Sequence, residues 1–240
     1  MKFLDYFEEQ KFNKISIFIN QEMINMPELK TFKHVCIFAV LFFFHKSEKE
    51  IIFGNINFLI YLTGLKKSSV YKALEDLSKA GLLKITKNSD KTTEYKLLLS
   101  NELEAKLSSK NNKFFFLKPW MNKLPELKTW SIRQIFAVIY SIDLFSSFGH
   151  RLVPRGLINN DIIFELTKLK KRSVFASIDQ LKNIDFIKSV KVEGRFLNKE
   201  FNKWYRGEYE SYQINKEYFF QEIKNDTKQL LSTVEFDKLS

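Results

Sequence analysis

The stretch "NINFLIYLTGLKKSSVYKALEDLSKAGLLK" runs from Asn55 to Lys84, and "NNDIIFELTKLKKRSVFASIDQLKNIDFIK" runs from Asn159 to Lys188. Ten of the thirty aligned positions are identical without a gap. Internal repeats of this length indicate that one structural unit occurs twice in a chain. The pattern inside this stretch therefore decides the fold of both halves.

The repeated stretch has the pattern of two helices joined by a tight turn. In the first copy, a short apolar run through Leu62 leads into the turn Thr63 to Leu65. The apolar residues Val70, Leu74 and Leu77 then recur at helical spacing, which predicts a longer helix with one buried stripe. The second copy has Val174, Ile178 and Leu181 at the same places.

Glycine marks two positions in the first copy where the second copy has another residue. Gly81 suits the left-handed conformation that ends many helices. The second copy departs from this pattern, because Lys168 replaces Gly64 and Asp185 replaces Gly81.

A second repeated stretch precedes the first. "MPELKTFKHVCIFAV", Met26 to Val40, matches "LPELKTWSIRQIFAV", Leu124 to Val138, at nine of fifteen positions. Apolar residues cover most of the circumference of the helix that Thr31 or Thr129 would begin, so each copy is expected to contain a central buried helix.

Strand-like runs follow each repeated stretch. "LLKITK" and "TEYKLLL" flank the polar turn "NSDKT" and predict a β-hairpin. In the second copy "FIKSVKVEG" and "YESYQIN" flank a longer connection, "RFLNKEFNKWYRGE". A short apolar strand, "ISIFI" or "FFFL", stands before each copy.

Helix, helix, turn, helix and hairpin is the order of a winged-helix domain. The sequence therefore predicts an α+β fold with two tandem winged-helix (helix-turn-helix plus β-hairpin wing) domains. We expect residues 1–110 to form the first domain, with a linking helix near its end. Residues 111–240 would form the second, with a long wing and a C-terminal helix from about Asn215.

Composition favours a polyanionic partner and a reducing compartment. The 240 residues include 39 Lys and Arg against 28 Asp and Glu, a net charge of +11. The single cysteine, Cys36, lies in an apolar run and predicts no disulfide framework. The longest apolar run, "VCIFAVLFFF", is too short to span a membrane, and the N-terminus does not resemble a secretory signal. We expect a cytoplasmic protein without a membrane partner, and composition leaves monomer and homodimer open.

The start of the second helix carries the main candidate DNA-binding residues. In a helix-turn-helix this part of the helix enters the major groove, where cations and hydroxyls meet phosphates and base edges. The candidates in the two copies are Lys66, Lys67, Ser68, Ser69, Tyr71 and Lys72, and Lys168, Lys170, Lys171, Arg172, Ser173 and Ser177. A solvated helix end is the alternative interpretation.

The hairpins form a second candidate surface. Their candidates are Lys87 and Lys91 in the first wing, and Lys191, Arg195, Lys203, Trp204 and Arg206 in the second. Aromatic residues among cations can stack or wedge against bases, although charged hairpin tips also serve solubility.

Catalytic motifs are missing from the sequence. The sequence has three histidines and neither His-x-His nor Cys-x-x-Cys spacing, so it predicts no metal site. It also lacks a Gly-x-x-x-x-Gly-Lys motif, so it predicts no nucleotide site. We therefore expect neither enzyme activity nor a cofactor.

The strand, the "PELKT" helix and the "LTGLKKSSVYKALEDLSKAGLLK" module together resemble the winged-helix domains of plasmid replication initiators and phage replisome organisers. Two such domains in one chain are similar to the iteron-binding initiators in particular. This resemblance implies sequence-specific binding of double-stranded DNA at repeated origin sites, replication initiation, and recruitment of host replication proteins. A transcriptional repressor and a winged-helix protein-interaction scaffold remain alternatives.

Overall fold

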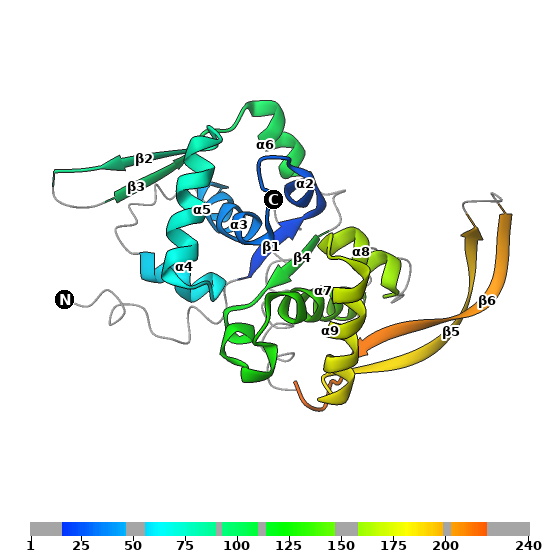
Figure 1. Cartoon of the computed structure of the whole chain (residues 1–240). Helices are drawn as coiled ribbons and strands as arrows, with labels where there is room; N and C mark the ends of the chain where they lie inside the picture. The colour runs from blue at the N-terminus through cyan, green and yellow to red at the C-terminus, as the bar shows by residue number, and fades with distance from the viewer. Residues whose placement is uncertain are drawn as a thin grey trace, which may run out of the picture. The chain divides into compact units, whose positions relative to one another are not determined.

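A computed structural model describes residues 16–46, 56–89, 93–109, 114–146, 158–198 and 203–219 (Figure 1). Helices and small two-stranded antiparallel sheets give an α+β architecture. The chain divides into two compact units, Met1–Lys128 and Thr129–Ser240.

The first unit contains most of the helices. Its elements are, in chain order, β1 (Ile17–Asn20), α2 (Gln21–Asn25), α3 (Phe32–Lys46), α4 (Ile56–Thr63), α5 (Lys67–Lys79), β2 (Leu83–Lys87), β3 (Thr93–Leu97), α6 (Asn101–Leu107), β4 (Phe114–Leu117), and the 3₁₀ turns η2 (Pro119–Lys123) and η3 (Pro125–Leu127).

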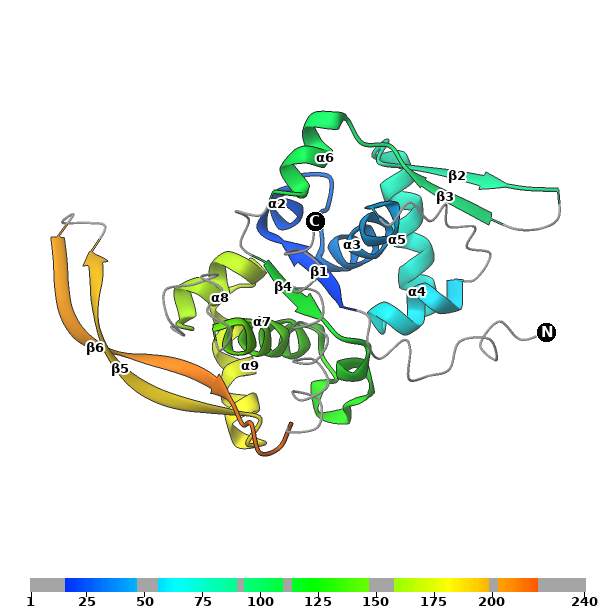
Figure 2. The ribbon, with the colours of Figure 1, turned by 180° about the vertical axis from the view of Figure 1, so that it is seen from behind.

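The second unit repeats the middle of this order. Its elements are α7 (Trp130–Ser146), α8 (Asn160–Thr167), α9 (Lys171–Asn183), β5 (Ile187–Asn198) and β6 (Lys203–Ile214), shown from behind in Figure 2. Helix, helix, turn, helix and hairpin thus follow one another in both units, as the sequence predicts.

The two upstream strands pair with each other. β1 runs antiparallel to β4, with Ile17 opposite Leu117 and Asn20 opposite Phe114. The sequence predicts a second domain that begins at residue 111 and contains the strand Phe114–Leu117. The structure instead places it in the first unit, because its backbone hydrogen bonds go to β1.

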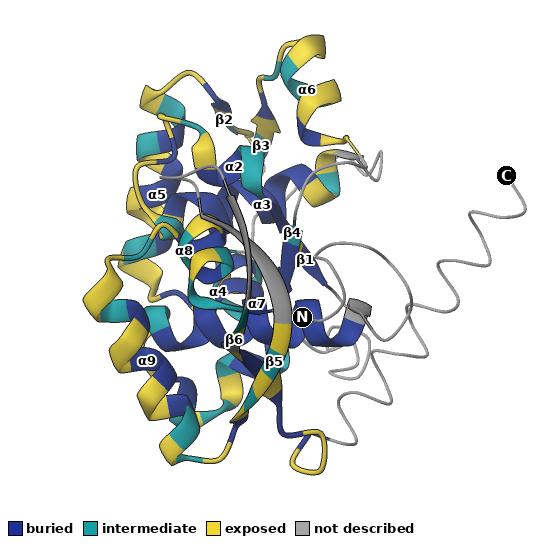
Figure 3. Cartoon of the chain, turned by 90° about the vertical axis from the view of Figure 1, so that its right-hand side faces the viewer, coloured by how far each residue is buried: buried dark blue, intermediate teal, exposed yellow. Residues whose placement is uncertain are grey.

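Helices α3 and α7 form the cores of their units. Every residue from His34 to Phe42 and from Ile132 to Leu144 is buried. Figure 3 shows α7 in the colour of buried residues, whereas α9 alternates between buried and exposed. The predicted inward stripes, Val70, Leu74 and Leu77 in α5 and their counterparts in α9, are buried as expected.

A threonine builds the same turn in both units. The Thr63 hydroxyl donates to the Leu59 carbonyl at 2.6 Å and accepts from the backbone N–H of Leu65 at 3.3 Å. Thr167 makes the same two bonds with Ile163 and Leu169, at 2.6 and 3.3 Å. These bonds satisfy buried backbone groups at the ends of α4 and α8, which explains why "LT" and the following leucine are repeated.

The turns keep one geometry even where glycine is replaced. Gly64 and Gly81 have φ of 65° and 74°, and their counterparts Lys168 and Asp185 have φ of 52° and 57°. At the end of α5 the backbone N–H of Leu82 donates to the Leu77 carbonyl, and the equivalent bond occurs at the end of α9. A residue other than glycine in this conformation costs about 1 kcal/mol.

The hairpin of the second unit differs from the prediction. β5 and β6 pair over twelve residues each, so most of "RFLNKEFNKWYRGE" lies in strands and not in a loop. The register places Phe196 opposite Tyr205 and Leu197 opposite Trp204. The backbone pairing therefore continues past the predicted ends of both strands.

The linking segment is partly a helix that belongs to the first unit. The Asn20 side chain donates to the Leu107 carbonyl at 2.6 Å, and Lys106 pairs with Glu22 at 2.9 Å. At the other end of the chain, Lys216–Phe219 form a turn after Asn215, and residues 220–240 of the predicted C-terminal helix lie outside the described part.

The positive φ angles generate a prediction about stability. Gly81→Ala should lower the free energy of unfolding by about 1 kcal/mol. A Cβ at this position would meet nothing within 4 Å, so the cost comes from the backbone alone. Lys168→Gly should raise it by up to about 1 kcal/mol, because glycine adopts φ of 52° without strain.

Chemical denaturation of each variant measures both effects. Gly81→Asn is the matched control, because asparagine tolerates the left-handed conformation and should cost less than alanine. Equal stability of the alanine variant and the parent protein would show that the helix does not end in this way.

Candidate nucleic-acid interface

Helices α5 and α9 begin on lysines that do not cap them. Lys66 and Lys170 stand at the N-cap positions in extended conformation, and neither side chain caps its helix by a hydrogen bond to a described residue. The first turns that follow contain cations and hydroxyls and no acidic residue. A cation at this end is unfavourable, because the helix dipole is positive there.

Three other helices begin in the opposite way. Asn20, Ser100 and Asn159 each accept a backbone N–H at the start of α2, α6 and α8. The first turn of each of these helices contains Asp or Glu. α2, α6 and α8 are therefore capped in the usual manner, whereas α5 and α9 are not.

The predicted cations at these two helix starts are exposed. We call the two clusters the basic turns: Lys66, Lys67 and Lys72 in the first unit, and Lys168, Lys170, Lys171 and Arg172 in the second. None of them forms an ion pair with another residue in the described ranges. These seven cations, which have no ion-pair partner among the described residues, give each unit a surface suited to phosphate.

The predicted hydroxyl and aromatic residues occupy different environments. Ser68 and Tyr71 are exposed, and Ser69 and Ser173 are half-buried. Ser177 was predicted to contact DNA, and this prediction is wrong because the residue is only 3% exposed. Ser177 lies one turn after Val174 on the buried face of α9, where the first unit has Ala73.

Charge changes sign along both helices. Glu75 and Asp76 lie beyond the basic turn of α5, and the exposed Asp179 lies beyond that of α9. Carboxylates repel phosphate, so only the first half of each helix is suited to DNA contact. This is the half that enters the major groove in helix-turn-helix proteins.

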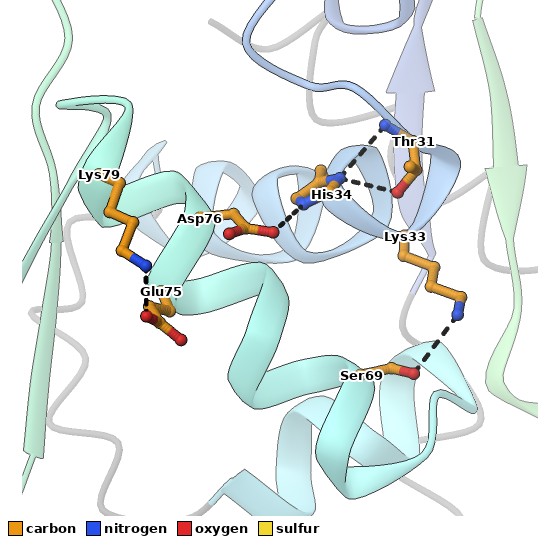
Figure 4. Close-up of polar contacts among 7 residues, drawn as sticks. All are labelled: Thr31, Lys33, His34, Ser69, Glu75, Asp76 and Lys79. Atoms are coloured by element: carbon orange, nitrogen blue, oxygen red, sulfur yellow. Dashed lines mark hydrogen bonds and ion pairs between the residues drawn. The ribbon is translucent and has the colours of Figure 1, made fainter.

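A histidine fixes α5 against α3 in the first unit (Figure 4). Nδ1 of the buried His34 accepts the backbone N–H of Thr31 at 3.2 Å, so Nε2 carries the proton and donates to Oδ2 of Asp76 at 3.1 Å. This hydrogen bond lowers the pKa of Asp76. Ile132 and Gln180 occupy the equivalent positions in the second unit, so this pair is particular to the first.

Lys33 adds a cation that the sequence does not predict at this surface. It lies beside the first turn of α5, where its Nζ donates to the Ser69 hydroxyl at 3.4 Å (Figure 4). The contact joins residues that are 36 positions apart, and no local pattern signals it.

The hairpin candidates are only partly described. Lys87 is exposed at the end of β2, and Lys91 lies outside the described residues. Lys191 is exposed and pairs with Glu208 at 3.3 Å, so part of its charge is neutralised. Four candidates lie in β5 and β6 by backbone, with side chains outside the described part: Arg195, Lys203, Trp204 and Arg206.

Glu210 anchors the base of the long hairpin to α9 and α8. One carboxylate oxygen accepts from Lys182 of α9 at 2.5 Å and from the Ser189 hydroxyl at 2.6 Å. The Tyr212 hydroxyl donates to the other oxygen at 3.2 Å and also lies 3.1 Å from Oδ1 of Asn160. The hydrogen bonds from Lys182 and Ser189 lower the pKa of Glu210, whereas burial and the Glu210 charge raise the pKa of Tyr212 to about 12.

Across the described residues, no group of three or more His, Cys, Asp or Glu side chains could hold a metal ion. No described helix is long and apolar enough to cross a membrane.

Comparison with protein-family models, curated proteins and solved structures finds no match to this chain.

The Glu210 network generates a prediction with a defined pH dependence. Glu210→Gln should lower the free energy of unfolding of the second unit by roughly 1 kcal/mol at neutral pH. A carboxyl whose pKa is lowered by folding stabilises the protein above its unfolded pKa, and this contribution disappears as the pH falls through the folded pKa. The difference between parent and variant should therefore shrink on acidification.

Thermal unfolding between pH 3 and pH 7 measures this difference. Glu208→Gln is the matched control, because Glu208 belongs to an exposed pair worth under about 1 kcal/mol. A constant difference across this pH range would contradict the assignment of Glu210 as the anchor.

Proposed function

We propose that this protein binds double-stranded DNA through two winged-helix units, with α5 and α9 as their recognition helices. In this proposal each basic turn faces the major groove, and the β2–β3 and β5–β6 hairpins are the wings. The fold proposal rests on the order of elements in both units and on the repeated turn built by Thr63 and Thr167.

The observation that carries the proposal is the pair of uncapped, cationic helix starts. A lysine at the positive end of a helix dipole destabilises the free protein, whereas a bound phosphate would reverse the sign of the interaction. The same chain caps three other helices with Asn or Ser and adds an acidic residue. A solvated helix end would give no reason for this difference to occur in both copies.

We further propose that the protein is a replication initiator of the plasmid or phage type, which binds repeated origin sequences and recruits host replication proteins. The resemblance of two winged-helix modules in one chain supports this role. A transcriptional repressor would use the same surfaces on an operator, and direct repeats beside the gene would distinguish the two. A protein-interaction scaffold would not require the basic turns.

DNA affinity should depend steeply on salt. Bound cations displace counterions from duplex DNA, so the logarithm of the association constant should fall linearly with the logarithm of the salt concentration. Replacing Lys66 and Lys67 by Ala should reduce this slope by about one for each phosphate that the variant no longer binds. Lys79→Ala is the matched control, because Lys79 lies at the other end of α5 and pairs with Glu75.

Fluorescence anisotropy with a labelled duplex at several salt concentrations gives the slopes. A slope near zero for the parent protein would reject nucleic acid as the partner. A slope that falls as much in Lys79→Ala as in the double variant would place the DNA contact elsewhere than the basic turn.

The two basic turns should occupy different parts of one DNA site. Half-sites on one face of B-DNA lie about 10 base pairs apart, so one chain should protect about 20 base pairs. Variants of Lys66 and Lys67 should lose protection over one half, and variants of Lys170, Lys171 and Arg172 over the other. DNase footprinting measures this protection. Full protection after substitution of the cations in either basic turn would show that only one of the two units binds DNA.

A further inference from the structure

An exposed aromatic ring occupies the same position in α5 and α9. Tyr71 is 52% exposed and Phe175 is 46% exposed. The two residues are 104 positions apart, the offset of the whole repeated stretch. Burying a ring of this size is worth about 2 kcal/mol, yet both units leave it in solvent.

Two of the neighbouring exposed positions have diverged, whereas Lys67 and Lys171 are the same in both units. Ser68 in the first unit corresponds to Arg172 in the second, and Lys72 corresponds to Ala176. These positions lie three residues before and one after the aromatic ring. An exposed aromatic residue that occurs in both units beside the same two lysines is more than one scattered surface hydrophobe.

The rings lie at the boundary between the two charge zones of each helix. Phe175 follows Lys171 and Arg172 by one helical turn on the exposed face, and Asp179 lies one turn further on. Phe164 of α8 supports the Phe175 ring edge-to-face, with centroids 6.0 Å apart. In α5 the Lys67 ammonium lies 6.0 Å from the centre of the Tyr71 ring.

The chemistry of the major groove defines what such a ring could contact. Base edges there present hydrogen-bond donors and acceptors and one apolar group, the C5-methyl of thymine. Phe175 has no hydrogen-bonding atom in its side chain, so among these features it can favour only the methyl. The adjacent cations would hold the phosphates on either side.

We propose that Phe175 contacts the C5-methyl group of a thymine in the major groove, and that Tyr71 makes the equivalent contact in the other half of the site. This proposal rests on the proposed function, because it requires the starts of α5 and α9 to enter the groove. It adds that each half-site contains thymine at the position that the ring reaches.

Removal of the methyl from the DNA tests the contact directly. Duplexes that bind the full-length protein are first selected from a random pool. One selected duplex is then prepared with thymine and with deoxyuridine, which pairs identically but lacks the methyl group. Affinities are measured for the parent protein, Phe175→Ala, Phe175→Gln and the matched control Gln180→Ala, which changes an exposed residue in the second half of α9.

The parent protein should bind the thymine duplex more tightly, by about fourfold for each methyl group buried. Both Phe175 variants should reduce this preference by about fourfold, whereas Gln180→Ala should retain it. The glutamine variant keeps a good helix former at the site, and circular dichroism establishes that each variant is folded.

Two outcomes would overturn the inference while leaving double-stranded DNA binding intact. These are equal affinity of the parent protein for both duplexes, and a loss of affinity in the Phe175 variants that is the same for both duplexes. Tighter binding to single strands than to duplex would indicate base stacking and would contradict the proposed function as well. Failure of the parent protein to bind any duplex would instead reject the proposed function and the inference with it.

Discussion

The burial of α3 and α7 on all sides is the constraint on which each unit depends. A helix that is apolar around its circumference cannot rest on one neighbour and face water elsewhere. Residues Ile132 to Leu144 are buried without interruption, and even Asp143 in that run accepts a backbone hydrogen bond, from Ile214 at 3.4 Å. The other elements of each unit are arranged as cover for this helix.

This constraint determines which face of α5 and of α9 is exposed to solvent. α5 and α9 each contribute one apolar stripe to the cover, with Val70 and Val174 completely buried. The opposite face, which carries the basic turn, is then directed outward by default. The turn before each helix sets the angle of approach, because Thr63 and Thr167 tie the end of the preceding helix to the same two backbone groups.

The backbone conformation of the turns is the same in both units, although the residues that form them differ. Lys168 and Asp185 adopt the conformation that glycine adopts in the first unit, although it is unfavourable for them. At Asp185 the cost is offset, because the Asn215 amide donates to the Asp185 carbonyl at 3.0 Å and to its carboxylate at 2.9 Å. At Asp185, hydrogen bonds from a residue 30 positions away therefore offset the local preference.

The sequence predicted the features that depend on local periodicity. The stripes of α5 and α9, the buried helices and the hairpins all follow from apolar spacing that repeats within a few residues. The sequence does not predict the pairing of β1 with β4, because Ile17 and Leu117 lie far apart in the chain. Each of the two strands also precedes one copy of the repeat, so each looks like a part of its own copy. Ser177 was misplaced because a serine on the buried face has the same sequence neighbours as a serine on the exposed face.

The position of the candidate interface was predictable from the sequence, but the contacts that hold its helices in place were not. Cations at the helix starts are visible in the sequence, whereas the contacts that hold them are long-range. Lys33 reaches Ser69, and His34 reaches Asp76, only because α3 crosses α5 in the folded unit. Glu210 likewise meets Lys182 only once the long hairpin has formed.

These supporting contacts show that the two copies hold their second helices by different polar means. The first unit links α5 directly to its core helix through His34 and Asp76. The second unit has Ile132 and Gln180 at those positions and links α9 to its hairpin through Lys182 and Glu210. The duplicated scaffold has thus diverged in how each helix is held as well as in which residues it exposes.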